Sequence, residues 1–274
     1  MTTKPDQYAV MGHPVAHSKS PRIHALFAAQ TGQQLEYRAI PVEPAGFAAA
    51  ARAFRDAGGK GLNVTLPFKQ DAWVFADLSS VRAERAGAVN TLIFEPGGTR
   101  GENTDGTGLV RDLTVNHGYS LAGRRVLLLG AGGAARGVLQ PLLLEGPAQL
   151  VIANRTAGKA LELALRFGDL GKVSASGFAE LAGRQFDLVI NATAAGLSAE
   201  VPPLPDGVLA PEGWCYDLVY GNGPTAFVRW GLGQGAVHAL DGLGMLVEQA
   251  AEAFRLWRGI LPETRPVIAA LRAG

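Results

Sequence analysis

The segment RRVLLLGAGGAA, residues 124–135, decides the fold of this chain. Its first half is a continuous apolar run, which is typical of a parallel strand covered on both faces. Its second half fits the pattern G-x-G-x-x-G/A, which joins a strand to a helix in dinucleotide-binding units. Gly130 permits a tight turn, Gly132 lets the backbone approach a pyrophosphate, and Ala135 lets the helix pack near the strand. Because the helix start offers free N–H groups to phosphates, we expect cofactor contacts from Gly130, Ala131, Gly132, Gly133 and Ala134.

Short apolar segments on both sides of this turn alternate with segments of helical length. Such alternation is typical of an α/β protein with mostly parallel sheets. The strands that we expect are residues 8–12, 35–40, 61–65, 89–94, 124–130, 149–153, 186–191 and 214–219. From Leu243 to Trp257 apolar residues recur at helical spacing, which predicts a C-terminal helix that packs back on the first part of the chain.

The composition favours a globular protein with a small-molecule partner. Hydrophobic residues make up 47% and charged residues 18% of the chain, and the formal net charge is +1. This balance, with Lys and Arg spread along the chain, argues against disorder and against nucleic-acid or anionic-membrane partners. No apolar targeting segment is evident near residue 1, and the apolar region 126–144 is interrupted by Arg136 and Pro141. We therefore expect a cytoplasmic protein.

The cysteine and histidine residues give no sign of a metal site or of a nucleophile. Cys215 is the only cysteine and stands in WCYDLVY, residues 214–220, beside no evident base, so we interpret it as a buried strand residue. His13 and His17 flank Pro14 in one loop, but they lack a neighbouring set of carboxylates. We expect turn or hydrogen-bonding roles for these histidines and no metal.

The residues after the second strand of the dinucleotide unit indicate which cofactor binds. NAD sites usually carry Asp or Glu at this place for the adenosine ribose, whereas this chain has Asn154, Arg155 and Thr156. Arg155 can stack on adenine or bind a 2′-phosphate with its planar fork, and Lys159 adds a donor. The alternative is that Arg155 is a solvated loop cation. The sequence predicts NADP(H) rather than NAD(H).

Three polar clusters follow expected strands in the first part of the chain, where ligands of α/β proteins gather: residues 18–21, 63–69 and 103–106. Ser18 and Ser20 precede Pro21 at an expected helix start, where they could hold a carboxylate, or Ser20 could simply cap the helix. Reduction of a ketone by hydride leaves an alkoxide that needs a proton, and Lys69 paired with Asp105 could deliver it. Alternatively, Lys69 is a surface cation and Asp105 a turn former.

At this point the chain resembles the shikimate dehydrogenase family, from Val10 to about Gly259. The resemblance is carried by several motifs in order: GHPVAHSKSP (12–21) with His24, NVT (63–65) with PFK (67–69), GAVNT (87–91), NTDG (103–106), the glycine turn, NRT (154–156), NAT (191–193) with Gly196, DLVY (217–220) and GLGML (242–246) with Gln249. The family implies an NADP-dependent oxidoreductase that reversibly reduces 3-dehydroshikimate to shikimate, on the route to chorismate and the aromatic amino acids.

The resemblance also implies roles for single residues. Ser18 and Ser20 would hold the substrate carboxylate, and Tyr220 would contact the substrate. The ring hydroxyls would be bound by Asn63, Thr65, Asn90, Asp105 and Gln249. Lys69 would be the main catalytic residue with help from Asp105, and either of the two could handle the proton. Gly242 and Met245 would border the nicotinamide, and Thr193 and Leu218 would also contact the cofactor, although Met245 could equally be a packing residue.

The expected architecture has two α/β domains. Residues 1–103 and 240–274 would form a substrate-binding catalytic domain with a mostly parallel sheet, completed by the C-terminal helix. Residues 104–239 would form a Rossmann-type NADP-binding domain. We expect a monomer or homodimer that binds its small-molecule substrate and neither nucleic acid nor membrane.

The chain departs from the family pattern at two places. After Tyr220 the usual Tyr-x-Pro is replaced by GNGPT (221–225), and His24 is followed by Ala25 where Asn is frequent. Three alternatives stay open: a quinate or aminoshikimate dehydrogenase of the same family, an NADP-binding sensor without turnover, and a methyltransferase with a similar glycine turn. Retention of both Lys69 and Asp105 argues against a sensor, and the loop 154–156 argues against a methyltransferase.

Overall fold

The computed structural model describes residues 4–193 and 200–273, so Gly196 of the NAT motif and both ends of the chain lie outside the described residues. The chain divides into a first unit, Met1–Gly108 with Leu246–Gly274, and a second unit, Leu109–Met245. The expected boundaries, after residues 103 and 239, lie several residues earlier. Both observed boundaries fall inside helices, where no change of composition marks them.

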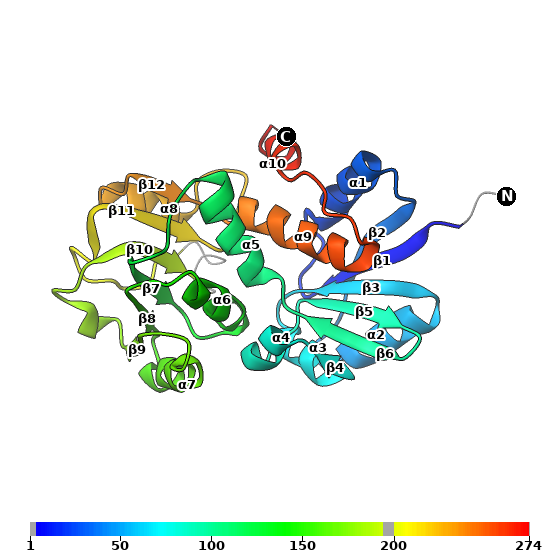
Figure 1. Cartoon of the computed structure of the whole chain (residues 1–274), viewed down its shortest axis with the longest axis horizontal. Helices are drawn as coiled ribbons and strands as arrows, with labels where there is room; N and C mark the ends of the chain where they lie inside the picture. The colour runs from blue at the N-terminus through cyan, green and yellow to red at the C-terminus, as the bar shows by residue number, and fades with distance from the viewer. Residues whose placement is uncertain (1–3, 194–199, 274) are drawn as a thin grey trace. The chain divides into compact units, whose positions relative to one another are not determined.

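The sheet of the first unit has the strand order β2-β1-β3-β5-β6-β4 (Figure 1). Its strands are β1 (Asp6–Gly12), β2 (Leu35–Pro41), β3 (Gly59–Val64), β4 (Leu78–Ser79), β5 (Thr91–Glu95) and β6 (Gly98–Glu102). Strands β2, β1 and β3 run parallel, as do β4 and β6, whereas β5 is antiparallel to both of its neighbours. Strands β4 and β6 were not expected, because β4 has two residues and β6 reads GTRGE, without apolar alternation.

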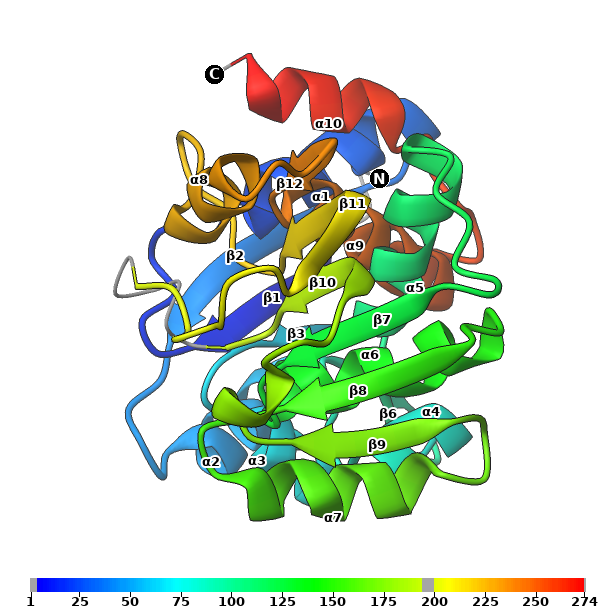
Figure 2. The ribbon, with the colours of Figure 1, turned by 90° about the vertical axis from the view of Figure 1, so that its left-hand side faces the viewer.

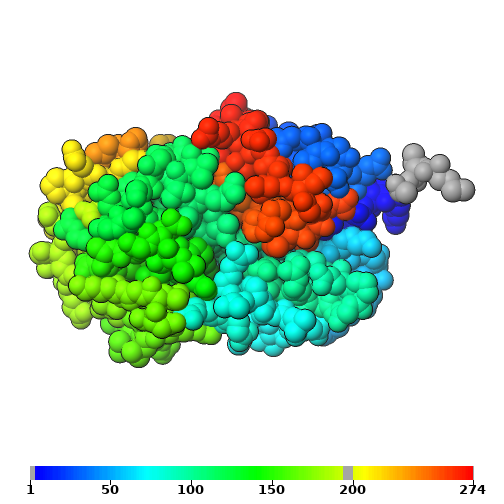
Figure 3. Space-filling view, viewed as in Figure 1, coloured from blue at the N-terminus to red at the C-terminus, as the bar shows by residue number. Residues whose placement is uncertain are grey.

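Helices cover both faces of this sheet. The helices that lie in the first unit, wholly or in part, are α1 (Ser20–Thr31), α2 (Phe47–Asp56), α3 (Lys69–Phe75), α4 (Val81–Ala86), α5 (Asp105–Arg111), α9 (Leu243–Arg258) and α10 (Arg265–Arg272). Alternate residues of β1 point to opposite faces: Met11 joins a core with Phe47 of α2, whereas the ring of Tyr8 contacts Trp257 of α9. The C-terminal helix thus packs on this sheet as expected, and its orange and red surface adjoins the blue N-terminal part in Figure 3.

The second unit has an all-parallel sheet with the order β12-β11-β10-β7-β8-β9, seen face-on in Figure 2. Its strands are β7 (Arg125–Leu129), β8 (Gln149–Ala153), β9 (Val173–Ser176), β10 (Phe186–Asn191), β11 (Leu209–Asp217) and β12 (His238–Leu240). Its complete helices are α6 (Gly133–Leu144), α7 (Ala157–Phe167) and α8 (Ala226–Gly233), and a π-helical turn spans Asp112–Asn116. The short edge strands β9 and β12 were not expected.

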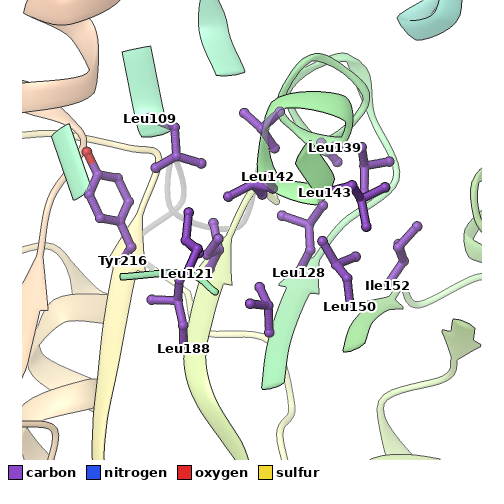
Figure 4. Packing of buried hydrophobic residues seen from close by; sticks show 14 of the residues in the cluster. Leu109, Leu121, Leu128, Leu139, Leu142, Leu143, Leu150, Ile152, Leu188 and Tyr216 are labelled. Carbon is purple, nitrogen blue, oxygen red and sulfur yellow. The ribbon is translucent and has the colours of Figure 1, made fainter. Parts of the chain in front are cut away.

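Alternation along the central strands builds two cores in this unit. Leu128 and Leu150 pack under α6 with Leu139, Leu142 and Leu143 (Figure 4). Leu127 and Val151, one residue along each strand, belong to the core on the opposite face. Because this sheet is covered on both faces, the strand within residues 124–130 is apolar at successive positions. Among the described residues, no helix is both long and apolar enough to cross a membrane.

Candidate functional site

The glycine turn lies at the point where the strand order of the second unit reverses. Strands β8 and β9 extend the sheet on one side of β7, and β10, β11 and β12 extend it on the other. In open α/β sheets this switch point is where ligands bind, beyond the carboxyl ends of the strands. The turn after β7 and the residues after β10 meet there, since a Cβ added to Gly130 would lie 2.9 Å from the carbonyl oxygen of Ala192.

The glycines of this turn answer different demands. Gly130 has φ +107°, and the approach of Ala192 leaves no room for a side chain, so the folded protein itself needs glycine there. Gly132 is the N-cap of α6 with φ −84° and ψ −171°, which any residue can adopt, and a Cβ on it would point into open space. Ala135 is completely buried and packs the helix on the sheet. Neither its backbone angles nor its surroundings within the protein require Gly132 to be glycine.

The first residues of α6 leave backbone donors for an anion. The first four N–H groups of a helix have no partner within it, and in α6 they belong to the first residues from Gly133 onward, Ala134 among them. Ala131, between the turn glycines, is 8% exposed. No acidic side chain stands in the first turn, so an anion would meet the positive end of the helix without competition from an adjacent carboxylate.

The residues expected to select the cofactor follow β8. The side-chain amide of Asn154 donates to the carbonyl oxygen of Thr156 at 3.0 Å, and Thr156 is the N-cap residue of α7. Arg155 and Lys159 are exposed. Among the described residues no ion pair involves Arg155, so its guanidinium has no competing carboxylate. Asn154, Arg155 and Thr156 form the short loop at the carboxyl end of β8, the strand next to β7, and Lys159 lies in the first turn of α7.

A buried hydrogen-bond network ties together the loops that follow β10 and β11. The Oδ1 atom of Asn191 accepts from the hydroxyl of Thr193 at 2.7 Å, and its Nδ2 atom donates to Asp217 at 3.0 Å. Asp217 is completely buried and also accepts from the hydroxyl of Thr225 at 2.6 Å. Burial raises the pKa of Asp217, and its hydrogen bonds oppose that rise in part. The network fixes Thr193 next to the glycine turn. Asn191 and Asp217 stand in the NAT and DLVY motifs, but nothing in the sequence indicated that they hydrogen-bond to each other.

Gly242 and Leu218 are held together by backbone contact. A Cβ on Gly242 would lie 2.4 Å from the carbonyl oxygen of Leu218, and the N–H of Gly242 donates to Val219 at 3.1 Å. Met245 lies one helical turn further on and is 8% exposed, within the core that contains Tyr216. The packing role considered for Met245 is therefore present in the structure. Tyr220, half-buried, follows on the loop after β11 in the same unit.

Cys215 is a structural residue of β11. Its side chain is 1% exposed, and burial raises the pKa of its thiol to about 12. The Cα of Gly231 in α8 packs so closely that an added Cβ would lie 2.9 Å from Sγ. The thiol is thus neutral and enclosed, as the interpretation of a buried strand residue requires. Among the described residues no group of three His, Cys, Asp or Glu side chains could hold a metal ion.

The first unit contains an ion pair between Lys69 and Asp105. Nζ of Lys69 lies 2.5 Å from Oδ2 of Asp105, and the two side chains are 14% and 7% exposed. Lys69 is the first residue of α3 and Asp105 the first of α5, so two helix starts meet at this pair. Residues 36 positions apart in sequence are therefore brought into direct contact. Lys69 is not the solvated surface cation that was considered as its alternative.

Asn90 and Gln249 adjoin this pair. Nδ2 of Asn90 donates to Oδ1 of Asp105 at 2.8 Å and lies 3.3 Å from Oε1 of Gln249. Both oxygens of Asp105 therefore have donors, one from an amide and one from an ammonium group. Thr104 completes the cluster, since its backbone N–H donates to Oδ1 of Asn90 at 2.9 Å. Thr104 stands inside the NTDG motif, and its position there was the only sequence signal for it.

Asn63 and Thr65 lie at the end of β3, next to the same cluster. The side-chain amide of Asn63 donates to the carbonyl oxygen of Asn90 at 3.3 Å. The backbone N–H of Thr65 donates to Met11 of β1 at 2.9 Å, and its methyl group packs where a Cβ of Gly12 would be. This contact explains why glycine opens the GHPVAHSKSP motif.

Ser18 and Ser20 stand at the start of α1. The backbone N–H of Ser20 donates to Oγ of Ser18 at 3.2 Å. Helix α1 begins at Ser20, and the N-cap residue is Lys19, which makes no side-chain capping bond. The simple capping role considered for Ser20 is therefore wrong, because Ser20 is already inside the helix. Its side chain is 5% exposed.

Models of protein families match three consecutive parts of the chain. Residues 10–92 match the substrate binding domain of shikimate dehydrogenase, residues 112–198 match shikimate/quinate 5-dehydrogenase, and residues 242–272 match the C-terminal domain of shikimate 5′-dehydrogenase. Curated relatives match along the whole chain. A protein of Alkalilimnicola ehrlichii named shikimate dehydrogenase (NADP(+)) is 62% identical over 97% of this chain and 98% of its own length. The chain belongs to the shikimate dehydrogenase family.

Other members of the shikimate dehydrogenase family agree with this assignment. The protein of the same name from Methylococcus capsulatus is 62% identical over 99% of this chain and 98% of its own length. The shikimate 5-dehydrogenase of Thermus thermophilus, solved in complex with NADP(H) and shikimate, superposes with a TM-score of 0.87. It is 36% identical, and the match covers 98% of this chain and 99% of that one. The family and the two-domain α/β fold predicted from the motifs are both confirmed.

Proposed function

We propose that this chain catalyses the reversible, NADPH-dependent reduction of 3-dehydroshikimate to shikimate. The observation that carries the proposal is the nearly buried ion pair of Lys69 and Asp105, with Asn90 and Gln249 directly beside it. The pair combines a proton donor and a carboxylate among amides that suit a hydroxylated ring. Relatives that match the full chain carry the name of this activity.

With the exception of Tyr220, the expected substrate-binding residues all belong to the first unit. Ser18 and Ser20 hold the carboxylate at the start of α1, where free backbone donors favour an anion. The ring hydroxyls are bound by Asn63, Thr65, Asn90, Asp105 and Gln249. Tyr220 contributes from the loop after β11. We infer that the first unit is the substrate-binding domain and that the second unit binds the cofactor.

The chemistry that the side chains must supply is a proton transfer. NADPH, when bound, supplies the hydride that adds to the ketone carbon, and the carbonyl oxygen then needs one proton. The Lys69 and Asp105 pair delivers this proton, with Nζ of Lys69 as the main donor. In the reverse direction the same pair takes the hydroxyl proton. The amide of Asn90 holds Asp105 from its other oxygen, which keeps the pair in one geometry.

The second unit fits NADP(H) as the cofactor. A Cβ on Gly132 would point into open space, so the protein backbone can approach the pyrophosphate there. Gly130, Ala131, Gly133 and Ala134 form the rest of the turn. Asn154, Arg155, Thr156 and Lys159 bind the 2′-phosphate. Near the nicotinamide lie Thr193, Leu218, Gly242 and Met245. We further infer that the enzyme is cytoplasmic and is a monomer or a homodimer. Light scattering of the purified protein would distinguish the monomer from the homodimer.

A single assay tests substrate and cofactor together. The purified enzyme is offered shikimate or quinate, each with NADP+ or NAD+, and formation of reduced nicotinamide is followed by absorbance. The proposal requires the highest kcat/KM with shikimate and NADP+. A preference for quinate would instead make the chain the quinate-specific member of the family. NADPH binding without turnover of either compound would favour a sensor.

A further inference from the structure

Tyr37 stands at the far end of a hydrogen-bond chain that leads to the catalytic pair. It lies in β2, the edge strand of the first unit's sheet, and its hydroxyl lies 2.7 Å from Oδ1 of Asn63. Nδ2 of Asn63 lies 3.1 Å from Oγ1 of Thr91, whose hydroxyl lies 2.9 Å from Oδ1 of Asn90. Asn90 then contacts Asp105. Neither Tyr37 nor Thr91 belongs to the residues so far given a role.

The direction of every hydrogen bond in this series follows from the contacts of Asn90, the residue next to Asp105. Oδ1 of Asn90 faces the backbone N–H of Thr104, and Nδ2 faces the carboxylate of Asp105, so the amide of Asn90 has one orientation. The hydroxyl of Thr91 must therefore donate to Asn90, which leaves its oxygen to accept from Asn63. The chain thus has a single polarity, with donors pointing toward Asp105.

The same reasoning fixes Asn63 and Tyr37. The second contact of the Asn63 amide nitrogen is the backbone carbonyl of Asn90, which can only accept, at 3.3 Å. Both hydrogens of Nδ2 are thereby used within the protein. Oδ1 must face Tyr37, and a carbonyl oxygen can only accept, so the phenol donates. One lone pair of Oδ1 then stays free for a ligand.

We propose that Tyr37 is a positioning residue for substrate binding, whose hydroxyl fixes the Asn63 amide so that Oδ1 accepts a hydrogen bond from a substrate hydroxyl. The inference rests on the proposed function and extends it, because it names the atom that Asn63 presents and the group that holds this atom in place. Without the phenol donor, Oδ1 loses a partner and the amide is held on one side only. The amide keeps its orientation through its two nitrogen contacts, but Oδ1 is held less firmly where a substrate hydroxyl meets it.

The surroundings of Tyr37 suit a permanent donor. Burial raises the pKa of Tyr37 well above its ordinary value, so the phenol keeps its proton throughout the working pH range. The ring of His24 stacks on that of Tyr37 with 4.1 Å between centroids and 8° between planes. Burial lowers the pKa of His24 to about 3, so this neighbour is neutral and brings no charge to the chain. The stack holds the phenol ring in the plane that reaches Asn63.

Steady-state kinetics of shikimate oxidation with Tyr37→Phe tests the proposal. The variant keeps the ring and its stack and loses the hydroxyl, which donates to Asn63 and also has a hydrogen bond with the side chain of Ser20. The KM for shikimate should rise about tenfold, in line with one lost hydrogen bond, while kcat and the KM for NADP+ stay within about threefold. Tyr8→Phe is the matched control, because its hydroxyl contacts Arg258 at 3.4 Å and does not face Asn63. The control should leave all three constants near those of the wild type.

A double variant decides whether Tyr37 acts through Asn63. If it does, Tyr37→Phe combined with Asn63→Ala has the same KM as Asn63→Ala alone. A KM for Tyr37→Phe within twofold of the wild type, or effects that multiply in the double variant, would overturn the proposal. Thr91→Val removes the hydroxyl that joins Asn63 to Asn90 and should also raise the KM for shikimate severalfold. This second variant tests the proposal if Tyr37→Phe does not fold. A wild-type enzyme that fails to oxidise shikimate removes the proposed function itself, and this inference with it.

Discussion

The two units provide their expected ligand-binding residues in different ways. In the second unit the glycine turn, the loop after β8 and the start of α6 offer backbone groups and exposed side chains at the ends of parallel strands. In the first unit Lys69, Asp105, Asn90 and Asn63 form a mostly buried network of side chains that hydrogen-bond to one another. The second unit thus offers its ligand backbone groups and exposed side chains. The first unit offers side chains that hold one another in place through hydrogen bonds.

This difference teaches where substitutions should have local effects and where they should spread. An exposed residue such as Arg155, which forms no ion pair within the described part of the chain, changes only what the ligand meets. A buried residue such as Asn90 holds neighbours in place, so its loss moves several groups at once. Exposed residues of the cofactor loop should therefore tolerate substitution without loss of stability, and buried members of the network around Asp105 should not. Four experiments test this contrast.

The largest effect is expected in the network. Lys69→Ala should lower kcat by about 10²-fold or more, because the proton donor is lost, while affinity for NADPH is retained. Fluorescence titration with NADPH and steady-state kinetics with shikimate measure the two quantities. Lys60→Ala, an exposed lysine of β3, is the matched control and should leave both unchanged. Turnover equal to that of the wild type would remove Lys69 from the mechanism.

In the exposed loop after β8, Arg155→Asp should weaken the binding of NADPH only. It replaces a fork that can bind a 2′-phosphate with a repelling carboxylate, so the KM for NADPH should rise about 30-fold or more and that for NADH should change little. Thermal unfolding should be unaltered. Lys172→Asp makes the same change of charge at another exposed position of the second unit and serves as control. Equal losses for the two cofactors would show that Arg155 does not read the phosphate.

The buried His24 makes the stability of the first unit depend on pH. Burial lowers its pKa to about 3, from an ordinary value of 6.5. Below pH 6.5 the unfolded chain therefore binds a proton that the folded protein does not, and stability falls as the pH is lowered toward 3. Between pH 7 and pH 5 this residue should contribute a loss of about 2 kcal/mol in the free energy of unfolding.

Urea unfolding of the wild type and of His24→Phe at the two pH values measures this contribution. The phenyl ring cannot take up a proton, so the difference between pH 7 and pH 5 should shrink by about the same 2 kcal/mol. The comparison uses the change with pH, and any constant cost of repacking cancels. A variant with the pH dependence of the wild type would mean that burial of His24 does not control the acid sensitivity of this unit.

The smallest effect is expected for Gly132→Ala, which is compared with Gly130→Ala in the same turn. Gly132→Ala should leave stability within about 0.5 kcal/mol, since its Cβ points into open space, and should weaken NADPH binding by about tenfold or less. Gly130→Ala should instead cost about 1–3 kcal/mol of stability through its positive φ and the contact with Ala192. Differential scanning calorimetry and NADPH titration distinguish them. Loss of stability in Gly132→Ala would contradict the assignment of that glycine to the ligand.

Sequence reasoning succeeded where local pattern and structure coincide. The central strands β8 and β10 begin and end at the residues expected for them, because a short, mainly apolar segment bounded by polar or glycine-rich breaks is typical of a strand buried on both faces. It failed for the edge strands β4, β9 and β12 and for the inner strand β6, which are short or lack alternation. Strand β11 also begins earlier than expected, through Pro211, Glu212 and Gly213, which do not favour a strand.

The candidate site divides in the same way. Motif positions identified Lys69, Asp105 and Asn90, whereas nothing in the sequence pointed to Thr91 or Tyr37 as their supports. Those two residues act through partners that are distant in sequence, and a hydroxyl group's partner depends on atoms that only folding brings near. The network of Asn191, Asp217 and Thr225 in the second unit was missed for the same reason.

The sequence by itself determined the family, the glycine turn between strand and helix and the cationic loop that favours NADP. Each of these is a local pattern of residue types, and its physical consequence, a tight turn or a charge beside a helix start, needs only neighbours along the chain. The tertiary structure alone decided that Lys69 meets Asp105, which way the amides of Asn63 and Asn90 face, and that Gly130 rather than Gly132 is demanded by the fold. These facts depend on distances between segments far apart in sequence, and only packing sets those distances.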